Sequence, residues 1–391
     1  MRPGVFLRIA AGSCIRTVGD SLARKLLIGR HTASTFFPYR RCAAPRRYKM
    51  KISLKPLNRQ VIVITGASSG IGLATAREAA RWGARLVLAS RNRKALDALV
   101  EELKASGSEA IAVTADVGIQ DDHKKILDAA TTAFGGVETW VNNAGVSIFG
   151  KLEDVAIEDQ RQLFETNFWG VVYGSLIAVG HMRETGGALI NVGSEVSDRA
   201  IPLQGMYSAS KHAIKAYTDA LRMELEAEGV PISVTLIKPA SIASRYVEHA
   251  KNYMDVEPRL PPPLYSPKAV AEAILYAAEH PIRDVFVGSP SKAISAIGQA
   301  MPSVADKLFG RFMMRAQRSE QPAQPRHDSL WDAGEDTIAE PGNVRARSHS
   351  VYTTLNTRWR GLALTGAGIA AAGAVLALLA GPGNARKGRR L

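Results

Sequence analysis

Tyr207 and Lys211 are the pair of residues in this sequence best suited to acid–base chemistry. They are four positions apart, so on a helix they share one face and the lysine ammonium lies near the tyrosine phenol. A free tyrosine titrates near pH ~10, and a fixed cation beside it favours the phenolate and lowers that pKa. Because such a pair alone usually lies on a solvent-exposed helix surface and has no catalytic role, the residues around it decide whether it is catalytic.

Ser194 ends a predicted buried strand upstream of this pair. From there its hydroxyl can bond and orient the substrate oxygen with which Tyr207 exchanges a proton. Such a set fits the interconversion of an alcohol and a carbonyl.

A glycine-rich segment, Thr-Gly-Ala-Ser-Ser-Gly-Ile-Gly at residues 65–72, follows the first predicted strand and precedes a helical pattern. Glycines let the backbone approach a pyrophosphate, whose charge is stabilised by the helix N-terminus. The alternative is a tight turn without a ligand. We predict a dinucleotide site that includes Gly66, Ser68, Ser69, Gly70, Ile71 and Gly72.

Five motifs, in order, resemble the short-chain dehydrogenase/reductase family over about residues 58–290. They are the Gly-x-x-x-Gly-x-Gly spacing, Asn142-Asn143-Ala144-Gly145 after the fourth strand, Asn167, Ser194, and Tyr207-x-x-x-Lys211. The resemblance implies a catalytic set of Ser194, Tyr207, Lys211 and Asn167, in which Asn167 holds a water that relays protons to Lys211. It also implies cofactor contacts from Asn143, Ala144, Gly145, Tyr207, Lys211, Asp116, Val117, Pro239 and Ile242.

The end of the second predicted strand indicates which cofactor is used. An acidic residue there would bond the adenosine ribose and repel a 2′-phosphate. This chain has Ser90 followed by Arg91 instead. Since a guanidinium pairs with phosphate, we predict NADP(H) rather than NAD; the alternative is that Arg91 is a solvated charge at a helix start.

Short apolar runs alternate with helical patterns from residue 61 to 290, which predicts an α/β fold: a Rossmann-like, doubly wound parallel sheet in three layers. Several of these runs are continuously apolar, as in strands buried on both faces. The predicted strands are 61–65, 85–90, 110–116, 139–142, 188–192, 232–238 and 284–288. The catalytic domain is predicted over 56–290.

Substrate contacts are expected from residues 146–151, 196–206 and 245–265. The apolar residues of the last segment could line a substrate pocket; the alternative is a lid that packs on its own domain. These residues are Tyr246, Val247, Tyr253, Met254, Leu260 and Leu264. The eight histidines show no zinc spacing and both cysteines, Cys14 and Cys42, precede the predicted domain, so no metal site is predicted.

The net charge of +14 is concentrated at the two ends of the chain. Residues 1–50 hold eleven Lys and Arg against one acid, Asp20, and four basic residues lie in the last ten. A neutral body with basic tails argues against a nucleic-acid partner. Residues 1–55 have the composition of a targeting segment, but we favour translation starting at Met50.

The C-terminal region is predicted to leave the catalytic domain. Residues 291–318 have amphipathic helical spacing, which fits a membrane surface or packing on the domain, and 319–357 are polar, as in a flexible linker. The uncharged stretch 361–380, within 358–391, is long enough for a transmembrane helix; an interfacial anchor is the alternative.

We therefore interpret the chain as a membrane-associated NADP-dependent oxidoreductase of a lipophilic alcohol or carbonyl, its catalytic domain on the cytoplasmic or another reducing side. Alternatives are a non-catalytic NADP-binding sensor or scaffold, and an isomerase or dehydratase on the same fold. The resemblance also implies a homodimer.

Overall fold

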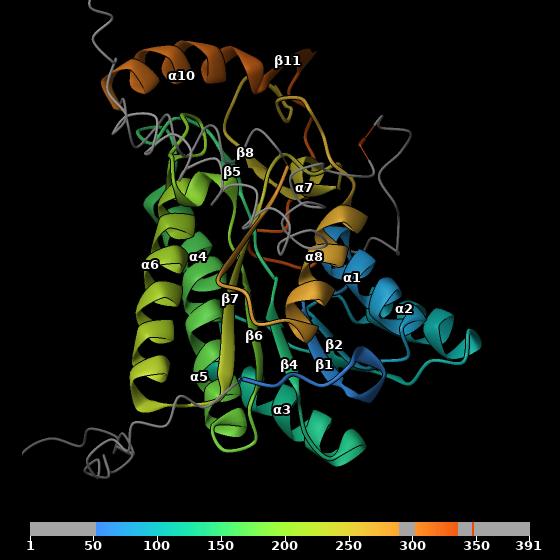
Figure 1. The fold of residues 1–391 in the computed structure, drawn as a ribbon. Helices are drawn as coiled ribbons and strands as arrows, with labels where there is room; N and C mark the ends of the chain where they lie inside the picture. Colours follow the sequence, from blue (N-terminus) through green and yellow to red (C-terminus); the bar gives the residue numbers. More distant parts are fainter. Residues whose placement is uncertain (1–51, 289–301, 335–345, 348–391) are drawn as a thin grey trace, which may run out of the picture. The chain divides into compact units, whose positions relative to one another are not determined.

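The computed structural model describes residues 52–288, 302–334 and 346–347. A seven-stranded sheet lies at the centre, with the order β10-β7-β6-β4-β1-β2-β3 and parallel neighbours throughout (Figure 1). The strands are β1 (Val61–Thr65), β2 (Arg85–Ser90), β3 (Ala110–Thr114), β4 (Thr139–Asn142), β6 (Gly187–Val192), β7 (Ile232–Pro239) and β10 (Asp284–Val287). All seven predicted strands are present, and the Rossmann-like part of the predicted fold is confirmed.

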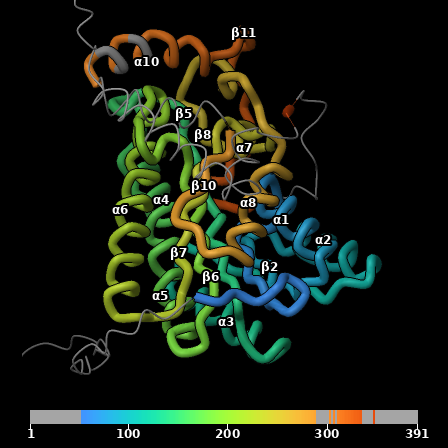
Figure 2. Tube along the Cα trace, viewed as in Figure 1, coloured from blue at the N-terminus to red at the C-terminus, as the bar shows by residue number. Residues whose placement is uncertain are grey.

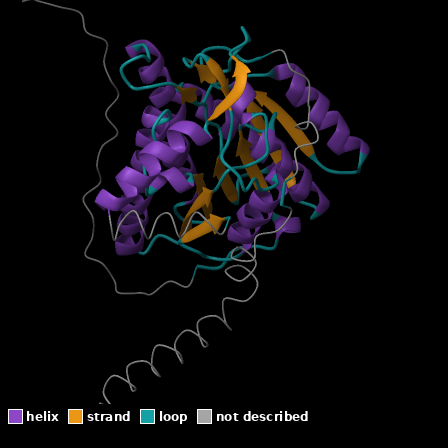
Figure 3. Cartoon of the chain, turned by 90° about the horizontal axis from the view of Figure 1, so that it is seen from above, coloured by secondary structure: helices purple, strands orange, loops and turns teal. Residues whose placement is uncertain are grey.

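Helices cover both faces of the sheet because its strands are apolar on both sides. In β1, Ile62 and Ile64 belong to one core and Val61 and Val63 to the other, since successive strand side chains point to opposite faces. Figure 3 shows the resulting layers. One core includes α1 (Gly70–Arg81), α2 (Arg93–Ala105) and α8 (Pro267–Glu279); the other includes α3 (Gln120–Phe134), α5 (Gly170–Met182) and α6 (Gly205–Glu228).

The remaining elements complete the described part of the chain. They are η1 (Leu57–Arg59), β5 (Ile148–Phe149), α4 (Ile157–Phe164), η2 (Glu165–Trp169), η3 (Glu195–Ser197), α7 (Tyr246–His249), β8 (Lys251–Asn252), β9 (Val256–Pro258), α10 (Pro302–Ala316) and β11 (Arg318–Pro322). In Figure 2, β5, β8, α7, α10 and β11 gather at one end of the molecule.

The direction of chain winding reverses between β1 and β4, which are neighbours in the sheet. The loops after these two strands therefore diverge at their carboxyl ends, where open parallel sheets bind ligands. Thr65 ties the two loops together: its Oγ1 accepts hydrogen bonds from the N–H groups of Asn143, at 3.0 Å, and Ala144, at 3.2 Å. The fold thus creates a crevice beside the glycine loop.

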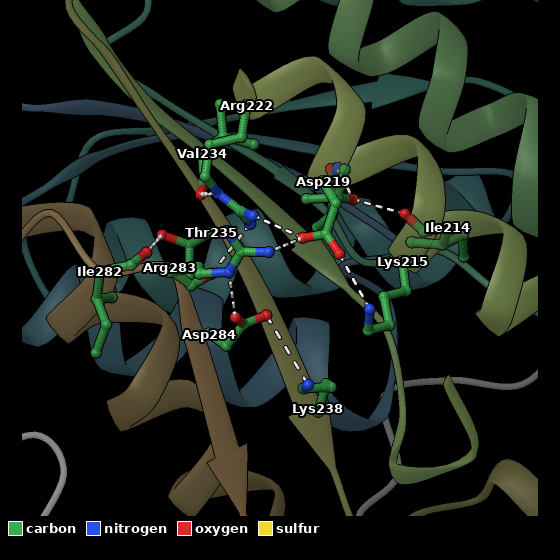
Figure 4. A network of polar contacts seen from close by, with 12 residues as sticks. Ile214, Lys215, Asp219, Arg222, Val234, Thr235, Lys238, Ile282, Arg283 and Asp284 are labelled. Atoms are coloured by element: carbon green, nitrogen blue, oxygen red, sulfur yellow. Dashed lines mark hydrogen bonds and ion pairs between the residues drawn. The ribbon is translucent and has the colours of Figure 1, made fainter. Parts of the chain in front are cut away.

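A network of charged residues attaches α6 to the edge formed by β7 and β10. The Asp219 carboxylate accepts hydrogen bonds from Lys215 at 3.0 Å, Arg222 at 2.7 Å and Arg283 at 2.8 Å (Figure 4). Burial raises the pKa of Asp219, but the hydrogen bonds from Lys215 and Arg222 outweigh it, and the pKa is lowered. The charged network therefore fixes the helix that carries the predicted catalytic pair.

Residues 319–334 differ from the predicted flexible linker. β11 pairs antiparallel with β9, and Leu330 is completely buried. The segment is polar on average, so composition alone does not show that a buried leucine and main-chain pairing help to hold it on the domain.

Within the described ranges, no helix is both long and apolar enough to cross a bilayer. By this finding, the predicted transmembrane helix and membrane-associated location are wrong. The most apolar, α5, has 13 residues, about 20 Å at ~1.5 Å per residue, against a hydrocarbon core of about 30 Å. The longest, α6, carries charges along its length, among them Lys215, Asp219 and Arg222. The stretch 361–380 and the N-terminal residues 1–51 lie outside the described residues.

Candidate active site

The predicted catalytic pair lies at the start of α6. Lys211 Nζ is 5.6 Å from the centre of the Tyr207 ring and donates a hydrogen bond to the main-chain oxygen of Val192 at 2.9 Å. Both side chains line one cavity. Helical spacing therefore places the amino group beside the phenol, and the end of β6 holds the lysine.

Ser194 reaches the same cavity from the loop after β6. Its hydroxyl caps η3 by accepting a hydrogen bond from the N–H of Val196 at 3.3 Å, and it is also hydrogen-bonded to Tyr207. The serine is thus held by the strand end and directed at the tyrosine.

Burial dominates the pKa values of the predicted catalytic pair. It lowers the pKa of Lys211 to about 8, because a buried ammonium loses its hydration. Burial also raises the pKa of Tyr207, and the hydrogen bonds with Tyr246 and Ser194 lower it by less, so the pKa is raised. The lowered tyrosine pKa predicted from the nearby cation is not found. The loss of hydration of the buried phenolate raises this pKa by more than the neighbouring hydrogen bonds lower it.

Asn167 lies in η2, a π-helical turn between α4 and α5; such turns occur frequently at functional sites. The side chain is completely buried, accepts a hydrogen bond from the Val146 N–H at 2.8 Å and donates to the Val146 oxygen at 3.0 Å and to Ser210 at 3.2 Å. Its amide therefore holds the loop after β4, and the predicted water relay stays a prediction.

The predicted dinucleotide loop lines a groove at the crevice between β1 and β4. A Cβ on Gly66 would lie 2.8 Å from Ala144 Cα, and one on Gly72 would lie 2.1 Å from the Gly66 oxygen, so the packing here requires glycine. Gly70, at φ +53°, begins α1, and a Cβ built on it would lie 3.4 Å from Ser244 Cβ, an ordinary contact, so here the backbone conformation is what favours glycine. This cradle fits the diphosphate of a dinucleotide.

The structure brings most of the predicted cofactor residues to this groove. Its lining includes Gly66, Ser68, Ser69, Gly70, Ile71, Ser90, Arg91, Asp116, Val117, Asn143, Ala144 and Gly145. Gly72 packs behind the loop, while Pro239 and Ile242 line the adjoining cavity that holds Tyr207 and Lys211. Because Ile71, Asn143 and Gly145 line both spaces, the groove and the cavity are adjacent.

Tyr246 is a polar member of the site that the sequence suggested only as an apolar contact. Its ring lies edge-on to Tyr207, with centres 5.6 Å apart, and its hydroxyl is 2.7 Å from Ser147 Oγ and 2.9 Å from Gln204 Oε1. Gln204 donates in turn to Gln317 Oε1 at 2.6 Å. No spacing in the sequence connects these residues, since the fold brings them together from separate segments.

Only part of the predicted substrate pocket is found. Tyr246 and Leu260 line the cavity at Tyr207. Val247 and Met254 instead pack around Phe149, and Tyr253 packs near Val146. The segment after α7 is therefore mainly a lid packed on its own domain, which was the second interpretation of its residues.

This fold and residue set define an NAD(P)-dependent oxidoreductase of the Rossmann type. The chain belongs to the short-chain dehydrogenase family, whose model, described as short chain dehydrogenase, matches residues 60–254.

Several known proteins are similar to this chain. Uncharacterized oxidoreductase YxnA of Bacillus subtilis is 49% identical over 313 residues, which cover 78% of this chain and 88% of that protein. 11-beta-hydroxysteroid dehydrogenase A of Sesamum indicum is 38% identical over 191 residues, 48% of this chain and 54% of the plant protein, so that match spans about half of its length.

Two solved structures of dehydrogenases are also similar to this chain. A short chain dehydrogenase/reductase from Burkholderia phymatum in complex with NAD has a TM-score of 0.59 at 26% identity and covers 70% of this chain and 99% of that one. An alcohol dehydrogenase from Thermococcus sibiricus complexed with 5-hydroxy-NADP has a TM-score of 0.52 at 27% identity, covering 58% and 95%. These two neighbours contain NAD and an NADP derivative, respectively.

Proposed function

We propose that this protein interconverts a lipophilic alcohol and its ketone or aldehyde, using NADP(H). The observation that carries this proposal is the convergence of Ser194, Tyr207 and Lys211 on one cavity directly beside the glycine-loop groove. A site that only sensed the cofactor would need neither a proton donor nor a second cavity.

The protein's own groups supply the proton transfer. A bound nicotinamide dinucleotide would supply or accept the hydride. In the reductive direction Tyr207 donates its phenolic proton to the substrate oxygen while Ser194 orients that oxygen. The Lys211 ammonium stabilises the phenolate that remains, and alcohol oxidation runs these transfers in reverse.

The lining of the cavity supports a lipophilic substrate. The cavity, of about 260 Å³, is bounded by the apolar residues Val196, Ile201, Leu260, Pro261, Pro262, Pro263, Phe312 and Met313. Phe312 and Met313 come from α10, which an ion pair between Arg199 and Asp306 also holds to the domain. Apolar walls with a few convergent polar groups are usual in small-molecule sites.

The direct test measures NADPH and NADH oxidation by purified protein over a panel of lipophilic ketones and aldehydes. Turnover with NADPH supports the proposal. Tight NADPH binding without turnover of any carbonyl would favour the sensor, and conversion without net redox change would favour an isomerase or dehydratase.

The homodimer implied by the family stays a prediction, for which the exposed Leu176 on α5 and Met223 on α6 offer apolar surface.

Arg91→Ala is expected to reduce the ratio of NADPH to NADH affinity by about 10- to 100-fold, since bonds to a charged partner are worth about 1.5–3 kcal/mol. The guanidinium lines the groove directly after β2, where Ser90 stands in place of an acid. Fluorescence titration with both cofactors measures this ratio. An unchanged ratio would remove the basis for the NADP preference.

Carbonyl reduction is expected to slow as pH rises through about 8. Burial lowers the pKa of Lys211 to about 8, so above that pH the ammonium that stabilises the Tyr207 phenolate is lost. The turnover number at saturating NADPH should fall about tenfold between pH ~7 and ~9. A profile that stays level across this range would contradict the assignment of a charged Lys211 to the reaction.

A further inference from the structure

Residues 328–334, here called the strap, lie along the cofactor groove although they follow the family's matched region by many residues. Ser329, Ala333 and Gly334 line the groove together with the glycine loop. Leu330 is completely buried, in a cluster that includes Leu163. The strap is therefore a packed part of the domain and one wall of the groove.

Hydrogen bonds anchor the strap at both of its ends and in the middle. Trp331 Nε1 donates to Asp159 Oδ1 at 2.7 Å, and the Ser329 N–H donates to the main-chain oxygen of His249 at 2.9 Å. Asn92 Nδ2, next to the end of β2, donates to the Gly334 oxygen at 2.6 Å. These partners come from separate elements, so the strap closes the groove on the side of β2 and α4.

The Arg91 guanidinium is held by the main chain of the strap. It donates to the oxygens of Ser329 at 2.5 Å, Trp331 at 3.0 Å and Leu330 at 3.5 Å. A guanidinium has five N–H donors, so these three contacts leave donors for an anion. The carbonyl dipoles also stabilise the positive charge and restrict the side chain to one orientation.

We propose that the strap is part of the cofactor-binding site: it orients Arg91 toward the adenosine end of the cofactor, strengthens the selection of NADPH over NADH, and slows cofactor release. The selectivity part rests on the proposed NADP preference, whereas slow release does not. Orienting the guanidinium before binding reduces the entropy lost on binding, and contacts between the cofactor and this wall of the groove would have to break before the cofactor leaves.

The first test removes the two side-chain anchors in the full-length protein with the double variant Leu330→Ser/Trp331→Ala. We expect NADPH to dissociate about tenfold faster, and the affinity ratio of NADPH to NADH to fall about threefold or more. Stopped-flow fluorescence measures the dissociation rates of NADPH and NADH, and fluorescence titration measures their affinities. The matched control is Arg318→Ala in β11, which removes an exposed ion pair between Arg318 and Asp255 and should leave NADPH release unchanged.

The second test needs no variant. NADP⁺ should slow amide hydrogen exchange in peptides covering the strap, including the Ser329 N–H, by about tenfold or more in wild-type protein. Wild-type release rates in the double variant, or strap exchange unaffected by NADP⁺, would overturn the inference.

The two proposals fail separately. If Arg91→Ala removes the cofactor preference but freeing the strap changes neither release nor selectivity, the strap inference falls and the proposed function stands. If NADP⁺ slows strap exchange and the double variant releases NADPH faster while Arg91→Ala leaves the preference unchanged, closure by the strap is supported and the NADP preference falls.

Discussion

Tyr207→Phe is expected to lower the turnover number for carbonyl reduction by about 10³-fold, in the range typical of a lost general acid. The phenylalanine ring fills the same space between Lys211 and Tyr246, so the cavity keeps its shape. The substitution removes only the hydroxyl that donates the proton. Affinity for NADPH should change by less than about twofold, because no group that cradles the diphosphate is altered.

The measurement pairs steady-state kinetics with NADPH titration for the variant and wild type. Tyr217→Phe is the matched control: it is the same substitution in the same helix, at a residue that lines neither the groove nor the cavity at Tyr207. Retained turnover in Tyr207→Phe would exclude Tyr207 as the proton donor. Equal losses in both variants would indicate damage to α6 instead.

Lys211→Met is expected to remove most of the activity and, at neutral pH, to stabilise the fold. The unfolded lysine titrates near pH ~10.4, whereas in the folded protein burial lowers the pKa to about 8. Folding at pH 7 therefore confines an ammonium where the charge is disfavoured. Methionine fills similar volume without charge but loses the hydrogen bond to Val192, so we expect a net gain of about 1–2 kcal/mol.

The pH dependence of stability identifies the cause. Between pH ~8 and ~10.4 the unfolded lysine binds more protons than the folded one, so wild-type stability from this group rises with pH across that window. The variant should lack this rise, and its advantage should shrink from pH ~7 to ~10. Urea unfolding of both proteins at pH ~7 and ~10 measures this difference in the free energy of unfolding. A variant less stable than wild type at pH ~7 would show that the bond to Val192 outweighs the buried charge.

Local patterns in the sequence were sufficient to locate the strands of the sheet, although some ends differ: the third strand, predicted over 110–116, is Ala110–Thr114 in the structure. Apolar runs predicted all seven strands, and most of them are buried on both faces, which requires such a run whatever its neighbours are. The glycine loop and the Tyr207–Lys211 spacing were also readable, since a tight turn and one helix face are set within a few residues.

Hydropathy predicted a membrane span at the uncharged stretch 361–380, which lies outside the described residues. Within the described ranges, no helix has the length and apolarity that a bilayer requires. The polar composition of 319–334 likewise predicted a flexible linker, whereas the structure places β11 on β9 and buries Leu330.

The sequence by itself determined where the strands lie, that a glycine loop stands between the first strand and a helix, and that Tyr207 and Lys211 share a helix face, because each of these patterns lies within a few consecutive residues. The catalytic roles of Ser194, Tyr207 and Lys211 stay predictions. Only the tertiary structure decided that Tyr246 contacts Tyr207, that burial raises the pKa of Tyr207, and that Arg91 is held by the strap. Each of these depends on packing between segments far apart in the chain, and neither composition nor spacing records which distant segments meet.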